Sequence, residues 1–366
     1  MAQHGPLVEK FEYLAARLLA SGVTALPPSV NQRTAAKIGD LFDRFDRKHR
    51  LRARYHIRLC FPDWTDDQVA ACARASTQNL MQLAFEILQT PSVLNEDSWR
   101  DHIETRGLGP AIDVLNADGP RILLTAHMGN WEVLGYFLAM LGYHTETIAR
   151  PLDNQRINDW LLGIRERKGM KILTKFDATE RMTEVLEQGR LLAFTADQNA
   201  GPKGVFVPFF GRLASTYKSI GLLAMTYRTP IICGYGHRLP GTFKFEVGTT
   251  DVIHPEEWED KSDPLFYITA RYCRAFERMV RLRPEQFLWT HRRWKHRPRH
   301  ELLGKPLPKA LRRSLEELPW MDEQTMRQIE NPPPLDPVEI KGKPSARKQR
   351  ARAKAKRLEA KRQAAG

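Results

Sequence analysis

The chain has 366 residues, 42% of them hydrophobic, which is long enough for one large α/β domain with additions or for two modest domains. Its net charge is +14, but residues 341–366 alone hold eleven Lys or Arg and one Glu, which is +10 of that total. The folded body is therefore only mildly basic. No nucleic-acid-binding signature accompanies the charge, so nucleic acid is not expected as a partner.

The first 26 residues do not resemble a signal peptide or a membrane span. No basic segment precedes a clean apolar run, and Glu9, Lys10, Glu12 and Arg17 interrupt the apolar residues of 7–26. An amphipathic helix is predicted instead, with its apolar row at Leu7, Phe11, Leu14, Leu18 and Leu19. Two alternatives remain open: the helix packs on the body, or it lies in a bilayer interface.

Residues 1–90 are predicted to form an N-terminal helical region. Pro27 and Pro28 separate the first helix from a second near 32–60. Thr65, followed by two aspartates, predicts the N-cap of a third helix that runs to about Leu88.

Residues 91–300 are predicted to form an α/β domain. Short apolar runs alternate with helical patterns, which is typical of a mainly parallel mixed sheet flanked by helices. The predicted strands are 121–126, 145–148, 171–173, 190–195 and 230–235, and the predicted helices are 131–141, 157–168, 179–188, 219–227 and 265–282.

Two segments follow this domain. Residues 301–340 are rich in proline and charge, and they predict a loosely ordered extension. Residues 341–366 are low-complexity Lys, Arg and Ala, which predicts a disordered basic tail. The four cysteines, which form no CxxC pair, are expected to be reduced and mostly buried, as in a cytosolic protein: Cys60, Cys72, Cys233 and Cys273.

The segment from His127 to Glu132, with sequence HMGNWE, carries the clearest chemistry. An apolar strand runs into His127, a small polar turn follows, and Glu132 opens a helical pattern. A neutral histidine removes a proton from a hydroxyl as its oxygen attacks a carbonyl, and a carboxylate on the far ring nitrogen fixes the tautomer. On one continuous helix, residues five apart lie about 140° from each other. We therefore expect Gly129 and Asn130 to form a turn that brings Glu132 to His127.

Four ordered blocks resemble the lipid A biosynthesis (late) acyltransferases of the lauroyl and myristoyl transferase type. These belong to the superfamily of glycerolipid acyltransferases with an HxxxxD/E motif. The resemblance covers roughly residues 10–300, and its blocks are His127–Glu132, Arg150–Asn154, Asp197 with Gln198 and Gly204–Gly211, and Arg283–Lys295.

The resemblance implies a glycerolipid-acyltransferase-like fold, an acyl carrier protein (or CoA) thioester as donor and a glycolipid hydroxyl as acceptor. It implies His127 as general base with Glu132 as its partner, and it requires no metal or other cofactor. It also implies the cytoplasmic face of a bacterial inner membrane. Because residues 7–26 are too charged to span, we expect peripheral attachment to an anionic membrane surface, which the basic tail could assist.

Further substrate-binding residues are predicted from the same blocks. Arg150 suits an acceptor phosphate, although an exposed loop arginine is the alternative. The same site is predicted to include Asn130, Asn154, Asp197 and Gln198. For Asn154 the alternative is capping of the helix that follows, and for Asp197 the alternative is a turn residue without contact to substrate. An apolar slot for the acyl chain is predicted from Phe206, Phe209 and Phe210, with plain core packing as the alternative. Gly211 is predicted to permit a tight turn beside the site and to contact substrate there.

Ligands of parallel α/β sheets bind beyond the carboxyl ends of strands, and His127, Arg150 and Asp197 all follow predicted strands. Two rival functions remain open. One is acylation of another glycolipid or a phospholipid, such as a mannosylated phosphoinositide or a glycerophospholipid. The other is a noncatalytic lipid- or RNA-binding protein that retains the fold and uses its basic tail.

Overall fold

A mixed sheet of seven strands, in the order β1-β9-β8-β2-β5-β3-β4, forms the centre of the protein. The computed structural model describes residues 5–174 and 178–333. Neighbouring strands are parallel except β8 and β9, which confirms the predicted mainly parallel mixed sheet. The strands are β1 (Ile103–Arg106), β2 (Arg121–Thr125), β3 (Thr145–Ala149), β4 (Lys171–Thr174), β5 (Leu191–Thr195), β8 (Ile231–Arg238) and β9 (Phe245–Ile253), with β6 (Val205–Phe209) and β7 (Arg212–Thr216) in a separate antiparallel hairpin.

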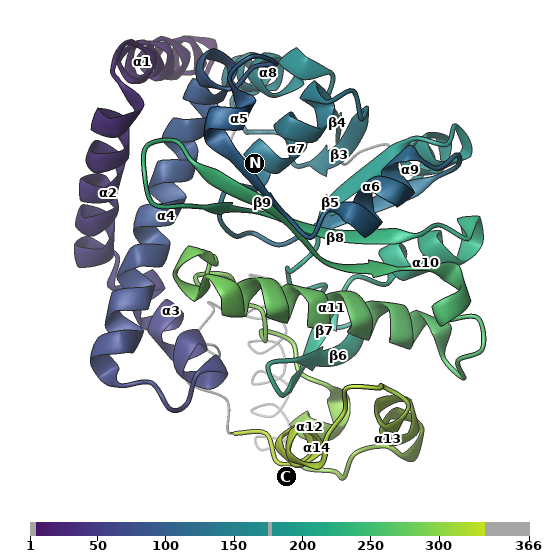
Figure 1. The fold of residues 1–366 in the computed structure, drawn as a ribbon. Helices are drawn as coiled ribbons and strands as arrows, with labels where there is room; N and C mark the ends of the chain where they lie inside the picture. The colour runs from purple at the N-terminus through teal and green to yellow at the C-terminus, as the bar shows by residue number, and fades with distance from the viewer. Residues whose placement is uncertain (1–4, 175–177, 334–366) are drawn as a thin grey trace, which may run out of the picture. The chain divides into compact units, whose positions relative to one another are not determined.

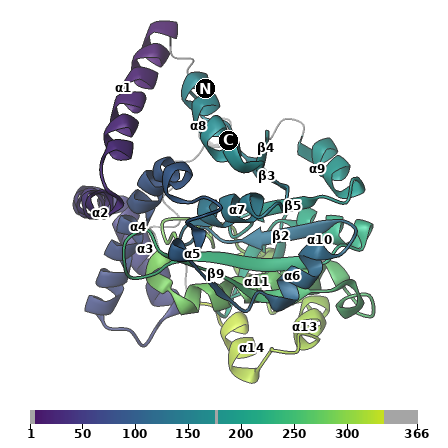
Figure 2. The ribbon, with the colours of Figure 1, turned by 45° about the horizontal axis from the view of Figure 1, so that its top comes forward.

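Helices cover both faces of the sheet, and a group of four long helices forms the N-terminal region (Figures 1 and 2). The first group comprises α1 (Pro6–Ala25), α2 (Pro28–Phe45), α3 (Arg47–Cys60) and α4 (Asp66–Val93). The others are α5 (Trp99–His102), α6 (Gly109–Asn116), α7 (Trp131–Met140), α8 (Gln155–Arg165), α9 (Ala178–Glu187), α10 (Lys218–Tyr227), α11 (Pro264–Leu282), α12 (Arg299–Leu302), α13 (Lys309–Glu316) and α14 (Glu323–Glu330).

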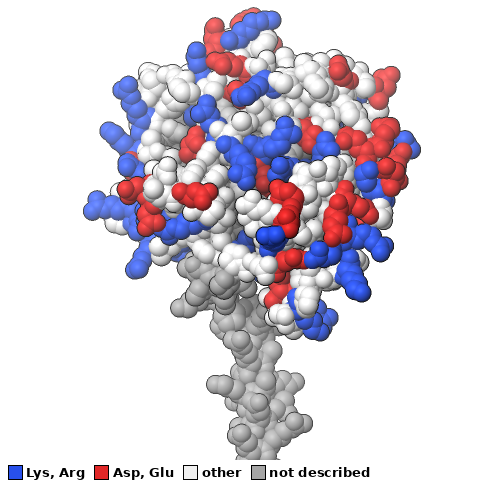
Figure 3. Space-filling view, turned by 60° about the horizontal axis from the view of Figure 1, so that its bottom comes forward, with Lys and Arg blue, Asp and Glu red and all other residues white. Residues whose placement is uncertain are grey.

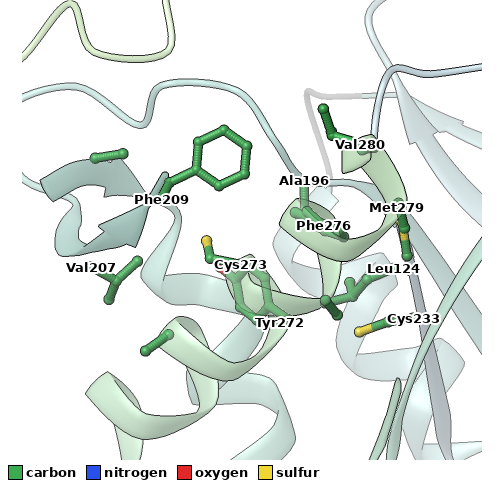
Figure 4. Close-up of a cluster of buried hydrophobic side chains, with 14 of the residues drawn as sticks. Leu124, Ala196, Val207, Phe209, Cys233, Tyr272, Cys273, Phe276, Met279 and Val280 are labelled. Atoms are coloured by element: carbon green, nitrogen blue, oxygen red, sulfur yellow. The ribbon is translucent and has the colours of Figure 1, made fainter. Parts of the chain in front are cut away.

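Strand β2 shows why this sheet is buried on both faces. Ile122 and Leu124 point into one core, to which α11 also contributes side chains. Leu123 points to the opposite face, into a second core that includes side chains of α7. Alternate apolar side chains on opposite faces are typical of a parallel strand covered by helices on both sides. Figure 4 shows the first core, in which Leu124 and Cys233 meet Phe276 and Met279 of α11.

The N-terminal helices follow the predicted signals. Thr65 caps α4 in a capping box, because its hydroxyl accepts from the Gln68 N–H while the Gln68 side chain accepts from the Thr65 N–H. Proline stands at the start of α2, where its missing N–H has no partner to lose. Within the described residues, no helix combines the length and apolarity that crossing a membrane requires.

The prediction of a loosely ordered extension after residue 300 is wrong for residues 301–333. Helices α13 and α14 form there, and Leu315, Leu318, Met326 and Ile329 are buried in the main core. Apolar residues at helical spacing outweigh the prolines, which stand between the helices. The main compact unit ends at Pro332, and the predicted basic tail at 341–366 lies outside the described residues. All four cysteines are free and buried, as expected.

Buried His237 gives a test of acid stability. It stacks on Tyr235 in β8 with ring centroids 4.1 Å apart, and neither ring nitrogen has a hydrogen-bond partner among the described residues. Burial lowers the pKa of His237 to about 3. Since the unfolded chain binds this proton below about pH 6.5 and the folded chain does not, folding stability falls as the pH drops from 6.5 toward 3.

Replacing His237 with phenylalanine is expected to weaken this pH dependence. At pH 5.5 a histidine that stays neutral when folded loses about 1.4 kcal/mol relative to neutral pH, and phenylalanine loses nothing. Urea unfolding at pH 7.5 and pH 5.5 measures the difference for both proteins. An unchanged difference between the two pH values would show that His237 is protonated in the folded state.

Candidate active site

Three neighbouring parallel strands end beside one another and carry the predicted site residues. Strand β2 lies beside β5, which lies beside β3, and Thr125 at the end of β2 is level with Thr195 at the end of β5. His127, Asp197 and Arg150 follow β2, β5 and β3 respectively. The structure therefore places all three beyond the same edge of the sheet, where ligands of parallel sheets bind.

His127 pairs with Asp197. The Nδ1 atom of His127 lies 2.6 Å from Oδ1 of Asp197, whose side chain is fully buried, while the histidine side chain remains 17% exposed. Burial alone would raise the pKa of Asp197, but the His127 and His291 rings oppose this and lower it to about 2. An ionised carboxylate on Nδ1 holds the imidazole in the tautomer that leaves Nε2 free to accept a proton.

Aromatic and polar side chains surround the free edge of the His127 ring. The Trp131 and His291 rings contact it edge-on, with centroids 5.1 and 4.6 Å away. The amide Nε2 of Gln198 lies 3.5 Å from His127 Nε2. Burial lowers the pKa of His291 to about 4, so this second histidine is neutral at pH 7. His127 is thus held from three sides with Nε2 toward Gln198.

Glu132 does not contact His127 as expected. Its carboxylate binds Arg165 of α8 through two hydrogen bonds, one of them 2.7 Å between Nε and Oε2, and accepts from the Trp131 indole at 3.1 Å. The turn at Gly129 and Asn130 starts α7 so that Glu132 points toward α8. The partner of His127 is Asp197, a residue predicted for the site but not for this role.

A cavity of about 350 Å³ adjoins the histidine. Polar side chains line one part of it, including His127, Gln198, Glu132, Arg165 and Arg150. Its apolar part is formed by Leu123, Leu134, Ile148, Met170, Ala193 and Phe194. Apolar walls with a few converging polar groups are typical of a small-molecule site.

The turn between His127 and α7 is anchored by a buried polar network that the sequence did not indicate. Asn130 is fully buried and caps α7, so the prediction that it binds substrate is wrong; its amide donates to Glu86 of α4 at 2.8 Å. Glu86 also forms a bidentate ion pair with Arg238 of β8, which in turn reaches Asn79. Asn79 donates to the Gly129 carbonyl at 3.3 Å.

The segment that follows α11 completes this anchoring. The Leu288 N–H donates to the His127 carbonyl at 2.9 Å, and the Gly129 N–H donates to the Gln286 carbonyl at 3.0 Å. Met128 and Phe287 form an isolated antiparallel bridge. The backbone on both sides of His127 is therefore fixed before any substrate binds.

Gly129 is expected to tolerate no side chain. Its φ is +56°, and a Cβ atom would lie 2.1 Å from the Gly236 carbonyl oxygen. Gly129→Ala therefore combines backbone strain with a clash against a rigid strand, and we expect a loss of about 2 kcal/mol or more in stability together with loss of turnover. Thermal unfolding and an acyl-transfer assay measure the two effects. Wild-type behaviour in both would mean that this turn is not held as described.

Arg150 and Asn154 differ in their surroundings. Arg150 lines the cavity, its side chain is 75% exposed and it lies 3.7 Å from Asp153, so it remains the predicted phosphate ligand. Asn154 instead caps α8, accepting from the Ile157 N–H at 3.2 Å, and its amide binds α1. The capping alternative is therefore the one that the structure shows for Asn154.

The aromatic block of the β6–β7 hairpin lies in the core. Phe209 is fully buried within the core that Figure 4 shows, Phe210 is 6% exposed, and neither lines the cavity beside His127. Gly211 has φ +65° and lies against Gln328 of α14. The prediction that Phe210 and Gly211 bind substrate is wrong, because the hairpin packs its aromatic side against Trp289 and α11.

His127, Asp197 and His291 form one further grouping. Their potential ligand atoms lie within 4.8 Å of one another, the only such group of His, Cys, Asp and Glu found in the described part of the chain. Imidazole nitrogen and carboxylate oxygen are ligands that zinc accepts. The absence of a metal requirement therefore stays a prediction.

A histidine with a buried carboxylate on one ring nitrogen, beside a cavity at the edge of a parallel sheet, is an arrangement typical of an enzyme active site. Residues 8–296 match the family described as bacterial lipid A biosynthesis acyltransferase. The chain belongs to this family and is an acyltransferase.

Curated relatives are similar over most of their length. Lipid A biosynthesis acyltransferase 2 of Shigella flexneri is 23% identical, over 77% of this chain and 89% of the relative. The lipid A biosynthesis lauroyltransferase of Escherichia coli K12 is also 23% identical, over 75% and 89%. The lipid A biosynthesis myristoyltransferase of the same strain is 22% identical, over 74% and 82%.

Proposed function

We propose that this protein transfers a fatty acyl chain from an acyl carrier protein thioester to a hydroxyl of a lipid A precursor or a similar glycolipid. The reaction takes place at the cytoplasmic face of the inner membrane, to which the protein is attached peripherally. The names of the relatives, which are lipid A biosynthesis acyltransferases, support the acceptor class.

The observation that carries the proposal is the geometry of the His127–Asp197 pair. Nδ1 of His127 is engaged by the buried Asp197 carboxylate, and Nε2 lies near Gln198, a side chain that also lines the cavity. A substrate hydroxyl bound in the cavity can donate its hydrogen bond to Nε2. A general base needs this contact with the proton that it abstracts.

The reaction then proceeds by direct transfer. The acceptor oxygen attacks the thioester carbon while its proton moves to Nε2, and Asp197 stabilises the imidazolium that forms. The tetrahedral intermediate collapses with cleavage of the carbon–sulfur bond. The imidazolium returns the proton to the leaving thiolate, so the products are an ester and a free thiol, and the histidine is neutral again.

The remainder of the cavity suits the two substrates. The exposed Arg150 guanidinium offers a paired donor to a phosphate on the acceptor. Arg165 is held by Glu132 in a largely buried ion pair, whereas Arg150 is exposed and lies 3.7 Å from the exposed Asp153, so Arg150 is the more accessible cation at this cavity. Leu134, Met170 and Phe194 provide apolar walls for the acyl chain.

The test is turnover by the purified full-length protein. Acyl carrier protein and CoA thioesters are supplied in separate reactions, each with a lipid A precursor or a glycerophospholipid as acceptor, beside His127→Ala. We expect turnover with the carrier thioester and the lipid A precursor, and its loss in the variant. Turnover that survives in His127→Ala would refute the mechanism. Tight binding to RNA or liposomes without turnover on any acceptor would favour a noncatalytic protein.

The same assay, repeated after treatment with a chelator, tests whether the reaction needs a metal. The metal-free mechanism predicts equal turnover before and after treatment with EDTA. Loss of turnover that zinc restores would instead assign the His127, Asp197 and His291 group to a metal.

A further inference from the structure

Helix α1 faces the protein with its polar side. Glu9, Glu12 and Tyr13 are half-buried and Ala20 is buried, whereas six large apolar side chains on the opposite side are 49–83% exposed: Leu7, Val8, Phe11, Leu14, Leu18 and Leu19. A helix that packs by its apolar row would show the reverse. Helix α1 does pack on the body, as one of the two alternatives proposed, but through its polar side, so its apolar row is not buried there.

Helix α2 continues this exposed apolar surface. Val30, Leu41, Phe42 and Phe45 are each at least 41% exposed, and Leu26 lies between the two helices at 46%. More than half of the large apolar side chains that are exposed in the described chain lie in residues 7–51. Scattered surface leucines are ordinary, but a concentration of this size on two consecutive helices marks a surface that another body covers.

The charged side chains of the same segment differ in exposure according to their sign. Every Lys and Arg of residues 5–48 is exposed, while every Asp and Glu of the segment is partly buried. The exposed cations are Lys10, Arg17, Arg33, Lys37, Arg44, Arg47 and Lys48. Figure 3, which views the molecule from another side, shows blue side chains projecting along the left edge, on the side where α2 and α3 lie in Figure 1.

We infer that the outward side of α1 and α2, called here the N-terminal face, docks on an anionic lipid bilayer. Apolar side chains flanked by exposed cations match an interface in which acyl chains lie beneath negatively charged headgroups. A second copy of the chain fits less well, because two such faces would oppose cations to cations. The inference rests on the peripheral attachment stated in the proposed function, and it assigns the surface that makes this attachment.

Docking by this face brings the cavity toward the lipid surface. Asn154 ties α1 to the start of α8 by donating to the Glu9 carbonyl at 2.9 Å and to Glu12 Oε2 at 2.8 Å. Arg17 lies over the Trp160 ring of α8 at 5.5 Å. Since Arg150 stands four residues before Asn154 and lines the cavity, these contacts of α1 connect the N-terminal face to the side of the cavity where Arg150 lies. An acceptor embedded in the membrane would then reach Arg150 first.

A single fluorescent label tests the contact directly. All four native cysteines are buried, so Leu14→Cys can be labelled selectively with an environment-sensitive dye, with Leu302→Cys on α12, 62% exposed, as the matched control. Vesicles of phosphatidylglycerol and phosphatidylcholine, without any acceptor, are added to the full-length protein. We expect a blue shift for the label at position 14 and none at position 302. Equal shifts at both positions, or none at position 14, would overturn the inference.

Substitutions separate docking from catalysis. Leu14→Asp with Leu18→Asp is expected to weaken vesicle binding about tenfold or more, and to leave turnover on detergent-dispersed acceptor unchanged. Leu302→Asp should change neither quantity. Unchanged vesicle binding by the double variant, equal loss of turnover in detergent, or a solution dimer that the double variant abolishes would overturn the inference. A wild-type protein that docks but turns over no acceptor would instead refute the proposed function.

Discussion

Asp197→Asn is expected to lower kcat by about 1,000- to 10,000-fold with little change in stability. The asparagine amide would donate to Nδ1 of His127, which forces the ring proton onto Nε2, the atom that must accept the proton of the substrate hydroxyl. The side chain keeps its size, so the buried position stays filled. Steady-state kinetics with the acyl thioester, beside thermal unfolding, measure the two effects.

Glu132→Gln is the matched control for this prediction. Glu132 contacts Arg165 and Trp131 rather than His127, so the same change from carboxylate to amide leaves the tautomer of His127 as it is. We expect a smaller loss of kcat than in Asp197→Asn. A large loss of kcat in Glu132→Gln, with Asp197→Asn close to wild type, would show that Glu132 rather than Asp197 is the partner of His127.

Glu86→Ala is expected to destabilise the protein by about 3–5 kcal/mol, because it leaves Arg238 as an uncompensated buried charge. Turnover should fall as well, since the same carboxylate holds the amide of Asn130 at the start of α7. Urea unfolding gives the stability, and kcat at a temperature where the variant is still folded gives the effect on positioning.

A double variant tests whether the unpaired charge of Arg238 causes the loss of stability in Glu86→Ala. Glu86→Leu with Arg238→Met removes both charges and keeps most of the volume, so we expect it to recover much of the stability of Glu86→Ala. Its turnover should remain low, because Asn130 and Asn79 still lack their charged partners. Full recovery of turnover would show that the network contributes to stability alone.

The sequence predicted the sheet edge of the site but not the pairing within it. His127, Arg150 and Asp197 were each recognised as residues that follow a strand, and the structure places them beyond one edge. A carboxylate five residues from His127 was a more visible partner than one seventy residues away. Contact between His127 and Asp197 depends on β2 lying next to β5, and no local pattern specifies that order of strands.

Buried charges and exposed apolar residues were the features that the sequence could not reveal. Glu86 lies within a long helix where surface glutamates are common, and only the tertiary fold turns it toward Arg238. The periodicity of α1 revealed an apolar row but not its direction, because spacing along a helix is the same whether the row faces the core or the solvent. Phe209 and Phe210 likewise showed an aromatic cluster without showing which core it joins.

The hydrogen bonds from Leu288 and Gln286 to the turn after His127 have a consequence for biosynthesis. The histidine emerges from the ribosome more than 150 residues before the segment that fixes its backbone. During synthesis β2 and β5 can already pair, yet the hydrogen bonds from this segment to His127 and Gly129 form only after residues 286–288 arrive. A polypeptide shortened before residue 286 would therefore hold His127 and Asp197 without the two backbone hydrogen bonds that fix the turn after the histidine.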